Sequence, residues 1–169
     1  LYGGNFAMKL GEWSDQETQI RFKLGTQESE FIVHYFASDR GSYNLILAPD
    51  RIILEKGAGP ENVLVLGESA YTRTADSWLD LSLRVDDGTH TVALGEETVI
   101  SASDPDPLQA GGIGFRYFGS DALDIDSITL KPLAAGAAQV APEDEVESEP
   151  TAITATPTTE PEGDFLNAL

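Results

Sequence analysis

Residues 79–85 alternate strictly between apolar and polar side chains, and this alternation constrains the fold more than any other feature. Leu79, Leu81, Leu83 and Val85 are separated by Asp80, Ser82 and Arg84. A period of two places one kind of side chain on each face of a β-strand, so the apolar face should be buried and the polar face exposed to solvent. Asp87-Gly88 follows as a hairpin signal, and residues 91–94 are the expected returning strand.

Similar segments recur along most of the chain. Runs of apolar, β-branched and aromatic residues are separated by turn-forming clusters such as 39–42 and 49–50. Further expected strands occupy residues 31–36, 43–47, 51–56 and 123–130. No long window has helical periodicity. The pattern predicts an all-β chain of about nine to twelve short strands, folded as an antiparallel sandwich or barrel.

The composition excludes several classes of partner. The chain has 29 Asp and Glu residues against 10 Lys and Arg, a net charge of −19. Nucleic acid requires a basic footprint that is missing here, so no nucleic-acid partner is expected. The absence of cysteine excludes disulfides and cysteine-based metal or redox sites. No apolar run in this sequence approaches the length of a membrane span.

A change in composition near Pro132 predicts the domain organisation. We expect a β-sandwich domain at 1–132, a disordered acidic Pro/Thr-rich linker at 133–164, and the possible start of a further domain at 165–169. The chain opens on Leu1 and has a single methionine, Met8. We therefore expect a piece of a longer protein, with a truncated N-terminal strand and any secretion signal or anchor outside it.

Residues 76–131 contain an ordered series of motifs. The series comprises Trp78 opening a strand, Asp87-Gly88, a strand ending at 98–102, the loop 104–108, Gly111-Gly112-Ile113-Gly114-Phe115-Arg116 and a strand at 122–126. This series resembles the concanavalin A-like lectin/glucanase superfamily, which includes laminin-G-like and 3-keto-disaccharide hydrolase-like domains; residues 19–24 and 41–47 fit its early strands. The resemblance implies an antiparallel jelly-roll β-sandwich. Trp78 is expected as a core anchor, and the glycines are expected where a strand enters a crowded bend.

The resemblance leaves three functional interpretations open, because such folds host lectins, enzymes and spacers. The first is a non-catalytic, extracellular or cell-surface module that binds carbohydrate within a larger multidomain protein. The second is a structural spacer or a domain that binds another extracellular protein. The third is a glycoside hydrolase-like enzyme. The sequence does not predict an oligomeric state.

Aromatic rings are the usual devices for binding sugars, since a flat ring stacks on the apolar face of a pyranose. The candidate ligand-binding residues are the aromatic Trp13, Tyr35, Tyr43 and Tyr117 and the polar Arg40, Asn44 and Arg116. Tyr35 and Tyr43 lie on neighbouring expected strands and could share one sheet face. The alternative is that these rings are half-buried sheet aromatics, as strand propensity favours.

No catalytic residue is assigned. Glycoside hydrolysis with retention needs two carboxyl groups about 5–5.5 Å apart. In the acidic cluster at 12–17, Glu12 and Asp15 would point to opposite faces of a strand, which leaves only Asp15 and Glu17 together. The two histidines do not complete a catalytic set either: His34 is expected as a packed or edge residue, and His90 as a solvated one beside a hairpin tip.

Asp124 and Asp126 are the candidate metal ligands. They alternate on one strand and share a face, and laminin-G-like modules often hold Ca²⁺ at the sandwich rim with carboxylates and carbonyl oxygens. The alternative is an ordinary solvated face flanking an inward Ile125. No other cofactor is expected.

Overall fold

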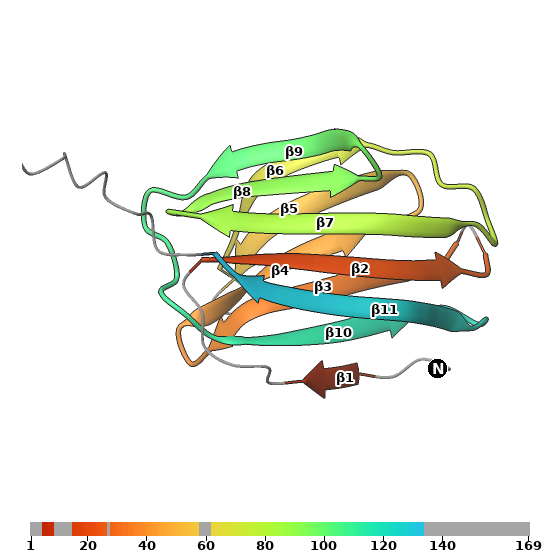
Figure 1. The fold of residues 1–169 in the computed structure, drawn as a ribbon, viewed down its shortest axis with the longest axis horizontal. Coiled ribbons are helices and arrows are strands. Elements are labelled where there is room, and N and C mark those ends of the chain that lie inside the picture. The colour runs from red at the N-terminus through yellow and green to blue at the C-terminus, as the bar shows by residue number, and fades with distance from the viewer. Residues whose placement is uncertain (1–4, 9–14, 27, 58–61, 134–169) are drawn as a thin grey trace, which may run out of the picture. The chain divides into compact units, whose positions relative to one another are not determined.

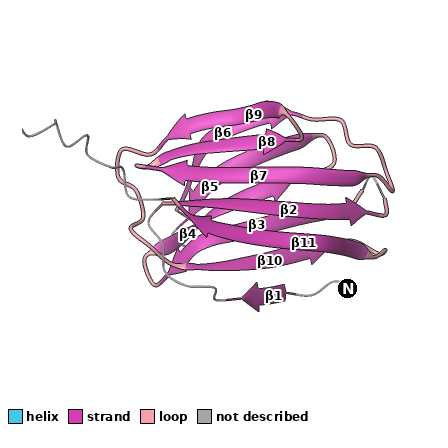
Figure 2. Ribbon diagram, in the orientation of Figure 1, coloured by secondary structure: helices cyan, strands magenta, loops and turns pink. Residues whose placement is uncertain are grey.

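The computed structural model describes residues 5–8, 15–26, 28–57 and 62–133. These residues form eleven strands and no helix (Figures 1 and 2). The strands are β1 (Asn5–Met8), β2 (Gln16–Leu24), β3 (Glu30–Ser38), β4 (Gly41–Leu47), β5 (Arg51–Gly57), β6 (Val63–Ala70), β7 (Trp78–Asp86), β8 (Thr89–Leu94), β9 (Glu97–Ser103), β10 (Gly112–Phe118) and β11 (Leu123–Pro132). The expected all-β class is confirmed, although β6 was not predicted and the expected N-terminal strand had been given no bounds.

The strands form two antiparallel sheets that stack as a sandwich. The six-stranded sheet has the order β1-β10-β3-β4-β5-β6, and the five-stranded sheet has the order β11-β2-β7-β8-β9. In Figure 1 the strands β2, β7 and β11 lie in the front layer, with β3, β4 and β5 behind them. The expected acidic linker and the segment 165–169 lie outside the described residues, apart from Leu133.

The core lies between the sheets and follows from the period of two. On β2, Ile20, Phe22 and Leu24 are buried, whereas Arg21 is exposed and Lys23 is half-buried. Phe22 crosses to the other sheet and packs on Phe31, with 4.8 Å between the ring centroids. Full burial of each such apolar side chain stabilises the fold by about 1.5–3 kcal/mol.

Gly111 occupies the crowded bend that the glycine-rich motif predicts. It precedes β10 and approaches the backbone of Phe36, which has a positive φ of 51° at an irregularity of β3. A Cβ atom on Gly111 would lie only 2.6 Å from the carbonyl oxygen of Phe36. Glycine is therefore required there by the close approach of two backbones, which confirms the structural interpretation.

A group of polar side chains is buried inside the core beside β8. The rings of Tyr35 and Tyr43 stack with centroids 5.2 Å apart, and His90 lies 4.4 Å from Tyr43. The Tyr35 hydroxyl lies 2.8 Å from Nδ1 of His90. His90 was expected to be solvated, but it is fully buried because Val92 and His90 share the inward face of β8. Burial lowers the pKa of His90 to about 4.

A buried ion pair closes this group. The Tyr43 hydroxyl donates to Oδ2 of Asp104 at 2.7 Å, and Nζ of Lys56 lies 2.9 Å from the same oxygen. Burial raises the pKa of Asp104, but hydrogen bonds from Tyr43, the Asp106 amide and Lys56 outweigh it and hold that pKa below its usual value. The loop at 104–108 is thereby fixed against the six-stranded sheet, since the Leu108 amide also donates to the Tyr43 hydroxyl at 2.9 Å.

Candidate functional site

A row of polar side chains crosses the outer face of the six-stranded sheet. His34 on β3, Asn44 on β4 and Glu55 on β5 are direct cross-strand partners. Nδ1 of His34 lies 2.7 Å from Oδ1 of Asn44, and Nδ2 of Asn44 donates to Oε1 of Glu55 at 3.0 Å. All three residues are half-buried. We call these three residues the polar row.

The hydrogen bonds fix which atoms of the polar row remain available. An ionised Glu55 only accepts, so the amide nitrogen of Asn44 must face it, and Oδ1 of Asn44 must face His34. That oxygen also accepts from the Ser42 hydroxyl at 3.0 Å. His34 Nδ1 therefore donates to this oxygen, which leaves the opposite ring nitrogen, Nε2, facing away from the bond. The row can offer this nitrogen and the Glu55 carboxylate to a ligand's hydroxyl groups.

The neighbours of the polar row make its surface amphipathic. A second row lies on the same three strands, two residues away from the polar row on each strand. Its cross-strand partners are Ile32, Ile46 and Ile53. At the ends, Gly114 pairs with His34, and Val65, 54% exposed, pairs with Glu55. A line of hydrogen-bonding groups therefore runs beside a line of aliphatic side chains, and Gly114 leaves the His34 end without an obstructing side chain.

Arg116 lies on the same face as the polar row. It stands two residues beyond Gly114 on β10, opposite Ile32. Its guanidinium lies 4.3 Å from the ring centroid of Phe118, which is 43% exposed. A cation held over an aromatic ring keeps its donors while losing conformational freedom. Two sequence candidates, Asn44 and Arg116, are thus on one surface.

The prediction that aromatic rings form a sugar-binding platform is wrong for the three tyrosines Tyr35, Tyr43 and Tyr117. Tyr35 and Tyr43 have no exposed surface and Tyr117 is 2% exposed, so their rings cannot stack on a sugar. Their hydroxyls are bonded inside the fold; that of Tyr117 donates to Oδ1 of Asp121 at 2.7 Å. The reason is parity: Tyr43 precedes Asn44 on one strand, so the two side chains point to opposite faces.

The remaining sequence candidates are scattered. Arg40 is exposed in the turn between β3 and β4, where its backbone amide donates to the hydroxyl oxygen of Ser38 at 3.2 Å. Trp13 lies outside the described residues. Asp15, from the acidic cluster, accepts a hydrogen bond from the Asp87 amide at 3.0 Å and so fixes a turn. Glu12 also lies outside the described residues.

Both candidate metal ligands are engaged by cations. Nζ of Lys23 lies 3.2 Å from Asp124, and Nε of Arg21 lies 3.7 Å from Asp126. A bulge in β11 between Ile125 and Ser127 accommodates Asp126. The described part of the chain contains no group of three or more His, Cys, Asp or Glu residues suited to a metal ion. The calcium site stays a prediction.

Trp78 was expected in the core, but its side chain is 44% exposed on the outer face of the five-stranded sheet. The alternation of β7 explains this, because Trp78 shares parity with Asp80 and Ser82 and not with the buried leucines. His34 and Glu55 were not predicted as partners of Asn44, because residues 31–36 are too uniformly apolar to show which side chains of that strand face outward. The pairing register that aligns them was not visible in the sequence.

Comparison with known structures identifies the fold. The carbohydrate binding module CBM66 from Bacillus subtilis matches with a TM-score of 0.65 and 13% identity, over 78% of this chain and 84% of that chain. A B. subtilis protein of unknown function with a galectin-like fold matches with a TM-score of 0.65 and 12% identity, over 77% and 78%. Sheep galectin-11, in complex with glycerol, matches with a TM-score of 0.58 and 9% identity, over 78% and 98%.

These likenesses confirm the antiparallel jelly-roll β-sandwich fold that residues 76–131 indicated. No protein-family model and no curated protein sequence matches the chain. Among the residues that the structure describes, there is no helix long and apolar enough to cross a membrane.

Proposed function

We propose that this chain is a carbohydrate-binding module that holds sugar hydroxyl groups on the polar row His34–Asn44–Glu55. The observation that carries the proposal is the continuous line of hydrogen bonds through these side chains across three adjacent strands. The similar folds of a carbohydrate binding module and of galectins support the ligand class.

The chemistry of the row suits a sugar. Neighbouring hydroxyl groups of a sugar each donate and accept, and the row presents an imidazole, an amide and a carboxylate along one line. Because the side chains already hold one another, little conformational entropy is lost when a ligand binds. The adjacent row of Ile32, Ile46 and Ile53 can contact the C–H surface of the same sugar.

An extracellular or cell-surface setting is part of the proposal, with a glycan as the partner. The two other interpretations predict different behaviour. A spacer or protein-interaction domain would bind no glycan. A glycoside hydrolase-like enzyme would release reducing sugar from its ligand.

A glycan array probed with the full chain tests the proposal, followed by affinity measurements on the glycans that bind. We expect Asn44→Ala and Glu55→Gln each to weaken binding about tenfold or more, because each removes a hydrogen bond and loosens the row. Thr91→Ala is the matched control, since Thr91 is half-buried on the outer face of the other sheet. Absence of binding across the array, or affinity unchanged in both row variants, would overturn the proposal.

A further inference from the structure

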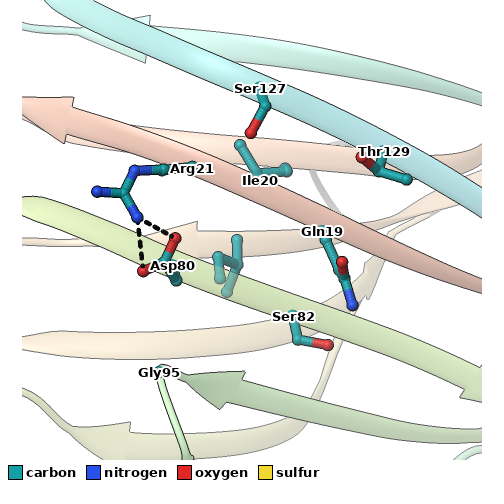
Figure 3. Close-up of a pocket in the computed structure, with 9 residues that line it drawn as sticks. Gln19, Ile20, Arg21, Asp80, Ser82, Gly95, Ser127 and Thr129 are labelled. Atoms are coloured by element: carbon teal, nitrogen blue, oxygen red, sulfur yellow. Dashed lines mark hydrogen bonds and ion pairs between the residues drawn. The ribbon is translucent and has the colours of Figure 1, made fainter.

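The outer face of the five-stranded sheet is hollowed where β2, β7 and β11 run side by side (Figure 3). This hollow has a volume of about 240 Å³. Its polar lining comprises Gln19, Arg21, Asp80, Ser82, Ser127 and Thr129. A second hollow of about 450 Å³ shares Asp80 and Gly95 with it. This hollow is also lined by Trp78 and Glu97, and by Ser69, Ala70 and Tyr71 at the end of β6. We call the two together the sheet groove.

Both positively charged side chains along the sheet groove form ion pairs with carboxylates. Arg21 contacts both carboxylate oxygens of Asp80 at 3.3 Å and lies 3.7 Å from Asp126. Lys23 lies 3.0 Å from Asp76 and 3.2 Å from Asp124. Each cation is therefore shared by two carboxylates, so the net charge of these side chains is negative. This balance disfavours an anionic ligand such as a phosphate, a nucleic acid or an acidic sugar.

The sheet groove also contains an exposed aromatic ring. Trp78 is 44% exposed, and Arg21 and Lys23 lie 5.7 and 5.6 Å from its ring centroid. Because both cations are anchored by carboxylates, they restrict the indole to one orientation. The groove therefore combines a fixed flat ring with hydroxyl and carboxylate groups, which is the combination that binds an uncharged polyhydroxyl chain.

Space is available beside the ring. Gly95, in the turn between β8 and β9, has a φ of 59°, and no atom lies within 4 Å of the position that a Cβ would occupy. Gly95 lines both hollows and adds no side chain to either. The residues that line the two hollows thus extend from Thr129 on β11 to Glu97 at the start of β9, a span suited to an elongated ligand.

We infer that the sheet groove is a second glycan-binding site, which takes an uncharged oligosaccharide chain with one sugar stacked on Trp78. The choice of glycan rests on the proposed function, whereas the site itself rests on the groove. Because the polar row lies on the outer face of the other sheet, the module then binds glycan on both faces. Such a module crosslinks polysaccharide chains, and its avidity exceeds the affinity of either site.

Amide spectra of isotope-labelled full chain, titrated with neutral cello-, xylo-, manno-, fructo- and galacto-oligosaccharides, test this inference. The expected result is a shift of the Trp78 indole signal and of the amides at 80–82 and 127–129, alongside shifts at the polar row. Trp78→Phe identifies the indole signal, since the chain has two tryptophans. Trp78→Ala and Ser82→Arg, which fills the hollow, should each abolish these shifts and leave those at Asn44 intact. Leu64→Ala, an exposed apolar residue on β6, is the control.

The outcomes separate the two proposals. Shifts confined to the polar row overturn the second site and leave the proposed function standing. Shifts confined to the sheet groove support the second site and overturn the polar row. Absence of shifts with every oligosaccharide overturns both.

Discussion

The hydroxyl of Tyr35 lies 2.8 Å from Nδ1 of His90, and neither side chain has any surface exposed to solvent. Nε2 of the same histidine is buried without a hydrogen-bond partner among the described residues. A proton on this ring would place a positive charge in the core, where the charge of Lys56 already raises the electrostatic potential. The pKa of His90 is accordingly lowered to about 4, chiefly by burial, although Asp104 raises it in part.

The first prediction concerns stability in acid. Since the folded pKa of His90 lies below its unfolded value, the unfolded chain binds the proton first as the pH falls. The contribution of His90 is fully present above about pH 6.5 and is lost as the pH falls toward 4. The free energy of unfolding should drop by about 3 kcal/mol across this window, as measured by urea titration at several pH values.

His90→Gln separates this effect from the titration of the carboxylates. Glutamine keeps a hydrogen-bonding group near Tyr35 but does not titrate. The variant should therefore lose stability less steeply between pH 6.5 and 4 than the natural chain. An identical pH dependence in both chains would contradict the assignment to His90.

The second prediction tests the core position of Tyr43. Tyr43→Phe removes the hydroxyl that donates to the buried carboxylate of Asp104 and accepts from the Leu108 amide. Thermal or urea unfolding should show a loss of about 1–3 kcal/mol, with glycan binding unchanged. Tyr71→Phe is the matched control, because the Tyr71 hydroxyl is buried without a partner among the described residues. Its removal should be neutral or stabilising, and equal losses in both variants would contradict the prediction.

The third prediction concerns the bend before β10. Gly111→Ala should destabilise the fold by about 1–3 kcal/mol, because the new methyl group meets the backbone of Phe36. Gly57→Ala provides the comparison, since a Cβ there meets its first neighbour at an ordinary 3.7 Å, the Asn44 amide. The midpoints of urea denaturation should differ clearly between the two variants. Similar midpoints would show that the bend can relax.

The fourth prediction concerns calcium at Asp124 and Asp126. An ion bound there must displace Lys23 and Arg21 from these carboxylates, so we expect a dissociation constant no tighter than about 10⁻⁴–10⁻³ M. Isothermal titration with Ca²⁺ measures it. Combined Asp124→Asn and Asp126→Asn should abolish the heat of binding, and Glu28→Gln is an exposed acidic control. Heat that persists in the double variant would place the ion elsewhere.

The polar row shows where prediction from sequence stops. Residues 31–36 are almost continuously apolar or aromatic, so the sequence does not say which parity faces the core. Tyr35 and Tyr43 were therefore expected on a binding surface, and His34 was expected only as a packing residue. By contrast, residues 79–85 have polar side chains at every second position, and their burial follows the expected pattern.

By itself, the sequence determined the strand class, the jelly-roll resemblance and the requirement for glycine at 111. These follow from local chemistry, namely the two-residue period and the steric freedom of glycine. Only the tertiary structure decided that His34, Asn44 and Glu55 form one row and that Trp78 lines a hollow sharing Asp80 with the one across β2, β7 and β11. Strand neighbours and register arise from burial of apolar side chains between residues far apart in the chain, and no local pattern encodes them.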